Sequence, residues 1–289
     1  MRPSDGMATV GKRAAARRSL RSLLACALLA LSATVADAET ITNARYAAPV
    51  ERYGHFALGR PHEYARLTVS TAAGQRHALE LPDDEVFEDL TPRLLTLAAG
   101  EPPELLVIVS HRNSGARLAL IGLHDGRLDI SAQSPPIGTP MRWLNPVGVA
   151  DLDGDGQAEI AAVTTPHRGG TLRVYRRTGK QLLEIAALAG VSNHTYGSPE
   201  LGLSTPVAIA GRTQLLLPDP THRRLRLIAL QDGQLVETAH CPLAAPLSGA
   251  VRQASATEVA VELRSGPALI ALQDCPASAP GAAPQRIAR

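Results

Sequence analysis

The chain has 289 residues, and its 29 Lys and Arg against 27 Asp and Glu give a formal net charge of +2. This balance excludes the strongly basic composition that is typical of nucleic-acid-binding proteins. Only 3% of the residues are aromatic, which leaves few rings for stacking against sugars. A chain of this length can bury the core of one large domain.

The first 38 residues have the pattern of a secretory signal peptide. Arginines between positions 13 and 21 precede an apolar run over residues 23–31, and small residues surround the predicted cleavage site at 36–38. The apolar run is shorter than the roughly 20 residues that a membrane-spanning helix needs. We therefore expect a mature chain that begins at Glu39, has no transmembrane segment and is periplasmic or extracellular.

Two other export signals fit the same segment, namely a twin-arginine signal at Arg17 and Arg18 and a lipid anchor on Cys26. Removing residues 1–38 takes away six Lys and Arg and two Asp, so the mature chain has 23 minus 25, a net charge of −2. Nothing in this charge indicates nucleic acid as a partner. Export also permits a disulfide between Cys241 and Cys275, which would close a loop of 34 residues (275 minus 241).

A turn glycine recurs along the chain at an almost fixed spacing. Strand-like apolar segments flank Gly74, Gly126, Gly179 and Gly233, which follow one another at 52, 53 and 54 residues, and a shortened copy ends at Asp274. Repeats of about 40 to 50 residues, made of short strands and tight hairpins, are typical of a β-propeller with one four-stranded blade per repeat.

We therefore predict an all-β fold, a single β-propeller domain of about five four-stranded blades over residues 39–275, with a disordered tail at 276–289. The expected blades are residues 39–82, 83–140, 141–198, 199–244 and 245–275. The fifth blade shows only three strands. Residues 40–46 either supply its missing outer strand, which would close the ring, or form the first strand of the first blade.

Apolar segments predict the individual strands of blades two to five. They are residues 93–99, 104–109, 116–123 and 127–130; 147–151, 158–164, 171–176 and 181–187; 205–210, 213–217, 224–230 and 234–238; and 247–251, 257–263 and 268–272. The Asp-Gly pairs that begin at Asp125 and Asp232 predict hairpin turns, and Trp143 is expected to pack in the core. The acidic run 83–89 is expected to be a solvated connection.

Residues 151–159, Asp-Leu-Asp-Gly-Asp-Gly-Gln-Ala-Glu, carry the chemistry of a cation site. Alternating carboxylates on a glycine-rich turn supply the six or seven oxygens that Ca²⁺ prefers at about 2.3 to 2.6 Å. The candidate ligands are Asp151, Asp153, Asp155 and Glu159 through their carboxylates and Gln157 through its carbonyl. An EF-hand would need a bidentate acid at position twelve, where this chain has Ala162. Apolar β-branched segments on both sides predict a strand-loop-strand site instead.

The run from Gly148 to Ile160, followed by the strand-like residues 171–175, resembles the FG-GAP/VCBS repeats of bacterial exported proteins and of integrin α-subunit propellers. The resemblance implies that the loop joins the first two strands of a blade and binds Ca²⁺ through the ligands named above. The matching places in the adjacent blades, residues 97–104 and 210–213, cannot cage a divalent ion. We therefore expect one calcium site.

The connections on the face opposite the predicted calcium loop are rich in histidine and arginine. Histidines recur at near-blade spacing at positions 62, 111, 167 and 222. One interpretation is that these are solvated turn residues, repeated because the blade is repeated. The other is a surface for an anionic ligand or a partner protein. The residues at its centre would be Arg142, His167, His194 and His222. A transition-metal site has less support, because none of these histidines shows close ligand spacing.

The chain has no Walker loop, zinc signature or nucleophile motif, and no catalytic residue is predicted. We expect a non-enzymatic, monomeric binding or scaffold module that holds Ca²⁺ in a structural role and recognises an unidentified protein or anionic ligand. The alternative is a propeller enzyme of the glycoside hydrolase or lyase type, with its site on the face opposite the calcium loop.

Overall fold

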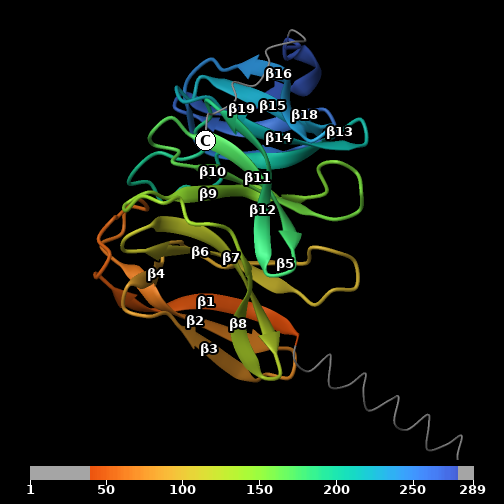
Figure 1. The fold of residues 1–289 in the computed structure, drawn as a ribbon. Coiled ribbons are helices and arrows are strands. Elements are labelled where there is room, and N and C mark those ends of the chain that lie inside the picture. The colour runs from red at the N-terminus through yellow and green to blue at the C-terminus, as the bar shows by residue number, and fades with distance from the viewer. Residues whose placement is uncertain (1–39, 279–289) are drawn as a thin grey trace, which may run out of the picture.

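The computed structural model describes residues 40–278. The predicted signal peptide and the residues after 278 lie outside this range. The described part contains 19 strands and one short 3-10 helix, Leu272–Asp274, so the predicted all-β class is confirmed. The strands form sheets of 12, 4 and 3 strands, which follow one another through the molecule in chain order (Figure 1). No helix within residues 40–278 has the length and apolar character needed to cross a membrane.

The N-terminal part of the largest sheet is built around its second strand. Its strands are β1 (Ile41–Val50), β2 (Glu63–Thr71), β3 (Arg76–Glu80), β4 (Glu85–Phe87) and β5 (Arg93–Leu95). β2 pairs with β1 on one side and with β3 and β4 on the other. Residues 40–46 therefore begin the first sheet, and the idea that they complete the fifth unit is wrong. Tyr46 on β1 stacks on Tyr64 and Phe87, which fixes this pairing.

The acidic run was expected to be solvated, and this expectation is wrong for its second half. β4 pairs with β2 and also with the next long strand, so the chain turns inward at Val86 and Phe87. Glu88 and Asp89 follow and are buried, with 2% and 1% of their surface exposed. Burial of these carboxylates is tolerated because each has a polar partner, which for Asp89 is Arg93 at 2.5 Å.

The later strands form successive antiparallel meanders. They are β6 (Glu104–His111), β7 (Gly115–His124) and β8 (Arg127–Gln133); β9 (Leu144–Ala150), β10 (Glu159–Thr164), β11 (Thr171–Thr178) and β12 (Gln181–Ala189); β13 (Thr205–Ile209), β14 (Arg212–Pro218), β15 (Arg224–Gln231) and β16 (Gln234–Pro242); and β17 (Leu247–Gln253), β18 (Glu258–Leu263) and β19 (Gly266–Ala271). The predicted strands of these units are confirmed, although several ends move by a few residues.

Each meander lies beside the next, with corresponding strands as neighbours. The first strands β9, β13 and β17 contact one another in order, and the last strands β8, β12 and β16 do the same.

The predicted hairpins are confirmed, because Asp125 and Asp232 have φ angles of 49° and their following glycines have 72° and 73°, as two-residue type I′ turns require. Trp143 is 1% exposed and packs in the core, as expected.

The C-terminal end of the described chain is tied to the preceding sheet. Cys241, in β16, forms a disulfide with Cys275, whose Cα atom lies 4.5 Å from its own. Beyond this bridge Ala277 pairs with Ala239, and the N–H of His240 donates to the carbonyl of Pro276 at 3.0 Å. The disorder predicted for residues 276–289 is therefore wrong for 276–278, because the disulfide holds them along β16. The other residues of that tail lie outside the described range.

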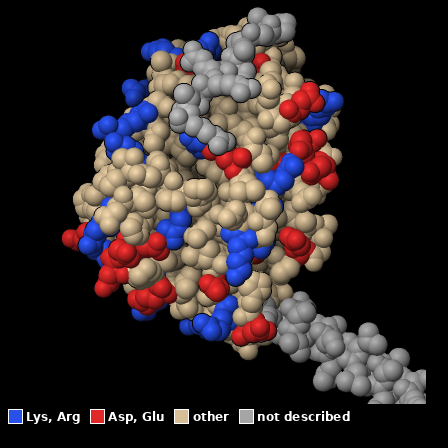
Figure 2. Space-filling model, in the orientation of Figure 1, with Lys and Arg blue, Asp and Glu red and all other residues tan. Residues whose placement is uncertain are grey.

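The surface carries charges of both signs. On the face shown in Figure 2, Lys and Arg side chains are interspersed with Asp and Glu over the described residues. The face shown therefore has no single basic patch of the kind that binds a phosphate backbone.

Candidate functional site

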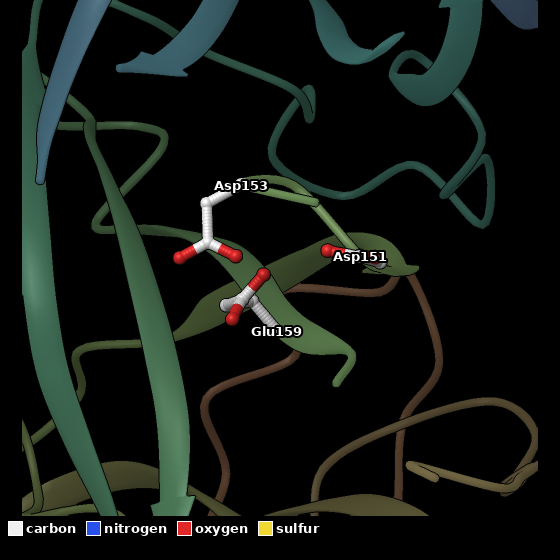
Figure 3. Close-up of side chains that lie close together, drawn as sticks. All are labelled: Asp151, Asp153 and Glu159. Carbon is white, nitrogen blue, oxygen red and sulfur yellow. The ribbon is translucent and has the colours of Figure 1, made fainter. Parts of the chain in front are cut away.

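The aspartate loop joins the end of β9 to the start of β10. Oxygens of Asp151, Asp153 and Glu159 lie within 4.8 Å of one another, and the three carboxylates gather around one point (Figure 3). Within residues 40–278 this is the one group of three or more such side chains with metal-site spacing. Gln157 follows in the same turn, and its N–H donates to Asp155.

The loop is shaped by hydrogen bonds from its own backbone. Gly154 and Gly156 donate their N–H groups to the two carboxylate oxygens of Asp151, at 2.7 and 3.0 Å. Gln157 donates to Asp155 Oδ1 at 2.8 Å. Both glycines have φ near +86° (85° and 87°), a left-handed conformation that a residue with a Cβ adopts only at a cost. The glycines at these positions therefore let the carboxylates turn inward.

Arg176 on β11 completes the group, and the sequence reading missed it. Its guanidinium lies 2.5 Å from Glu159, 2.6 Å from Asp153 and 3.5 Å from Asp155. The hydrogen bond from Arg176 lowers the pKa of Asp153. Glu159 is fully buried, and its other oxygen accepts the N–H of Leu152 at 2.9 Å. The pairing register of β10 and β11 could have identified Arg176 from the sequence. Ile160 pairs with Tyr175, which brings Glu159 opposite Arg176.

The donor set fits a hard dication. Arg176 contacts Asp153, Asp155 and Glu159, and Asp151, Asp153 and Glu159 have metal-site spacing, so Asp155 lies outside that group. The four carboxylates and the one guanidinium have a formal charge of −3 (−4 plus +1). A calcium ion would reduce this to −1, and oxygen donors are the ligands it prefers. Arg176 neutralises part of the loop and leaves the rest of the charge for a cation.

A second cluster, the histidine hollow, lies at the other end of β10. Because β10 has six residues, the two ends are about 17 Å apart. The hollow has a volume of about 320 Å³ and is formed by four separate connections. Its lining residues are His55, Met141, Arg142, Trp143, Thr165, His167, Arg168 and Tyr196.

Hydrogen bonds fix the tautomers of two histidines at the hollow. His194 Nε2 lies 2.9 Å from the carbonyl oxygen of Ser198, which can only accept, so this nitrogen carries the proton. Burial lowers the pKa of both His194 and His167 to about 4, so both rings are neutral at pH 7. His194 Nδ1 is then an acceptor for His167 Nε2–H at 2.7 Å. The lone pair of His167 is left on Nδ1.

His55 is held by a buried carboxylate. Its Nδ1 lies 2.7 Å from Glu88 Oε1, and Ser110 Oγ donates to Glu88 Oε2 at 2.5 Å. Burial raises the pKa of Glu88. The carbonyl of Glu88 accepts Nε1–H of Trp143 at 2.9 Å. A carboxylate behind an imidazole orients the ring, and this unit was not predicted because its members lie on different connections.

The structure gathers most of the predicted face residues. His167 contacts His194, Arg142 lines the same hollow, and His222 reaches the cluster through Ser192 Oγ at 3.3 Å. The other two repeated histidines lie elsewhere. His62 packs against Tyr64, and His111 lies 3.2 Å from Asp84.

Two larger hollows, of about 460 and 640 Å³, are lined mainly by charged residues that are already paired, with Glu101 and Lys180 as the exceptions. Arg177 binds Glu104 in the first, and Arg117 binds Glu85 in the second. Their charged groups therefore offer less to a ligand than the histidine hollow does.

No protein-family model matches the chain, and no curated protein matches it either.

Proposed function

We propose that the protein is an exported, calcium-stabilised β-propeller of the FG-GAP/VCBS type, which acts as a non-enzymatic binding or scaffold module. The observation that carries this proposal is the convergence of Asp151, Asp153 and the fully buried Glu159 at a strand-loop-strand turn. A buried carboxylate beside two others is costly unless positive charge balances the group, and Arg176 supplies only one such charge.

The calcium would have a structural role. Asp151 follows β9 directly and Glu159 begins β10, so a cation at the loop would tie these two strands together, while the Arg176–Glu159 ion pair joins β11 to the same carboxylate. Ligands on rigid strand ends favour a permanently occupied site, since Ca²⁺ is plentiful outside cells and saturates sites of micromolar to millimolar affinity.

The propeller part of the proposal is supported by the order of the strands. Meanders of three or four strands repeat along the chain, with first strands next to first strands and last strands next to last strands. This is the relation that neighbouring propeller blades have. Strand β4, which pairs with both β2 and β6, adds a link between the first two units.

Calorimetric titration of the mature chain with CaCl₂ tests the calcium proposal. We expect one site per chain, which is lost when Asp151→Asn and Asp153→Asn are combined. Asp232→Asn is the matched control, because it makes the same chemical change in a hairpin turn where Asn also tolerates positive φ. Absence of binding heat, or binding that survives in the double variant, would refute the proposal.

A second candidate function is a propeller enzyme with its site on the opposite face, and the Glu88–His55 pair favours it. An imidazole oriented by a buried carboxylate is a competent general base. The test is a screen of glycosides and acidic polysaccharides for turnover by the mature chain. An enzyme loses this turnover in Glu88→Gln while calcium binding is unchanged, whereas a binding module turns over none of them.

A further inference from the structure

The histidine hollow presents two imidazole nitrogens without a protein partner. Nε2 of His55 and Nδ1 of His167 hydrogen-bond to no residue within 40–278, and neither is sealed away from solvent. The opposite nitrogen of each ring is already engaged, with Glu88 and with His194 respectively. In a neutral His55 ring that donates Nδ1–H to an ionised Glu88, Nε2 offers a lone pair to a hydrogen-bond donor in the hollow, as Nδ1 of His167 does.

Two arginines add positive charge to the same hollow. Neither Arg142 nor Arg168 has a carboxylate partner among the described residues, and Nη1 of Arg142 donates only to the carbonyl of Met141 at 2.8 Å. No Asp or Glu lines the hollow, because Glu88 lies behind His55. Guanidinium groups bind carboxylates with two parallel hydrogen bonds, so the hollow favours an anion.

The walls of the hollow are preorganised. The ring of Trp143 lies parallel to that of His167, with centroids 6.0 Å apart and an angle of 3°. Tyr196 meets both His55 and His167 edge-on, and its hydroxyl donates to the carbonyl of His55 at 2.6 Å. The ligand-facing rings are therefore held before a ligand arrives, which reduces the entropy cost of binding.

We propose that the histidine hollow binds a small polyhydroxy carboxylate, the chemical class of the sugar acids. The ligand carboxylate pairs with Arg142 and Arg168, and its hydroxyls donate to His55 Nε2 and His167 Nδ1. A simple anion would leave the imidazoles without donors, and a neutral sugar would leave the arginines without an anion. The volume of about 320 Å³ is at the lower end for small-molecule sites and suits a ligand of monosaccharide size.

This assignment rests on the proposed function only in treating the protein as a binding module. Calorimetric titration of the mature chain with gluconate and galacturonate tests it, with glucose and acetate as comparison ligands. We expect one site for the sugar acids, with glucose and acetate at least about tenfold weaker. Combining Arg142→Gln with Arg168→Gln is expected to weaken sugar-acid binding by about tenfold or more, and Arg168→Gln alone in the same direction.

Arg112→Gln is the matched control, because Arg112 follows His111 in the equivalent connection of the preceding unit and lies outside the hollow. It should leave binding unchanged, and circular dichroism should show that all variants are folded. The proposal is overturned if neither sugar acid binds, if acetate binds as tightly as gluconate, or if the arginine variants bind like the original chain. Repeating the titration in EDTA separates this result from the calcium proposal, because the two sites lie about 17 Å apart along β10.

Discussion

At the scale of single residues, the acidic loop over residues 151–159 holds more negative charge than Arg176 balances. Arg176 contacts Asp153, Asp155 and Glu159, while Asp151 is satisfied by the N–H groups of the loop. Of the four carboxylates, Glu159 is the most destabilised by a loss of balancing positive charge, since it has no exposed surface. The carboxylates of the loop therefore depend on Arg176 for positive charge, and the proposed calcium ion would share that role.

Replacing Arg176 by Gln should make the fold more dependent on calcium. In EDTA we expect a loss of about 2 kcal/mol in unfolding free energy, because a charge-assisted hydrogen bond to buried Glu159 is removed. Added Ca²⁺ should restore more stability to this variant than to the original chain. Urea unfolding with and without Ca²⁺ measures both effects. Arg173→Gln is the control, because Arg173 lies on the same strand but binds Glu184; equal calcium responses in the two variants would exclude a role for Arg176 in the loop.

The buried pair of His167 and His194 predicts a pH dependence of stability. The pKa values of His167 and His194 are lowered by burial to about 4, below the 6.5 of an unfolded histidine. Between these values the unfolded chain binds protons that the folded chain does not, so stability falls as the pH decreases from 6.5 to about 4. Above pH 6.5 these two groups contribute no pH dependence. NMR titration of the imidazole nitrogens checks this, and midpoints near 6.5 in the folded protein would contradict it.

At the scale of secondary-structure elements, the hollow depends on close packing between two distant connections. The N–H of Gly197 donates to the carbonyl of Ala57 at 2.8 Å, and a Cβ on Gly59 would lie 2.2 Å from the carbonyl oxygen of Gly197. Gly59 also has a φ of +69°. These contacts hold the connection after β1 against the one after β12, and both supply walls of the hollow.

Gly59→Ala should therefore destabilise the protein and open the hollow. Gly74→Ala is a matched control, because Gly74 has a φ of +76° but nothing within 4 Å of the added Cβ. The control should cost about 1 to 2 kcal/mol from backbone strain alone. Gly59→Ala should cost about 1 to 3 kcal/mol more because of the steric clash. Equal unfolding free energies for the two variants, measured in urea, would show that the connections are not tightly packed.

The disulfide links the last sheet to the one before it. Its 34-residue loop predicts that combining Cys241→Ser with Cys275→Ser lowers the unfolding free energy by about 3 to 4 kcal/mol. Reduction of the original chain should give a similar loss. Urea unfolding of oxidised and reduced protein tests this, and coincident transitions would mean that the bridge does not constrain the unfolded chain.

The strands were predictable because their signals are local. Apolar segments and Asp-Gly turns lie within a few residues of one another, so β9 to β12 could be placed from the sequence. β4 was not predictable, since its residues carry acidic neighbours and become a strand only by pairing with two others. The His55–Glu88 unit was missed for the same reason, because its members are 33 residues apart and meet through tertiary packing.

At the scale of the whole molecule, three features of residues 40–278 connect segments that lie on different strands or connections. The acidic loop lies at one end of β10, the histidine hollow lies at the other, and the disulfide ties the C-terminal sheet to β16. The acidic loop belongs to the central unit, β9 to β12, which contacts strands of the units before and after it. Stabilising this unit should therefore stabilise the molecule as a whole.

The central claim is that calcium at the Asp151 loop stabilises this fold. Differential scanning calorimetry of the mature chain in millimolar CaCl₂ and in EDTA tests it most directly. With free Ca²⁺ about 100 times the dissociation constant, binding to the folded state alone contributes about 2.7 kcal/mol, so Tm should rise by several degrees. The rise should disappear when Asp151→Asn and Asp153→Asn are combined and persist in Asp232→Asn. The same Tm in calcium and in EDTA, for a chain that folds normally, would contradict the claim.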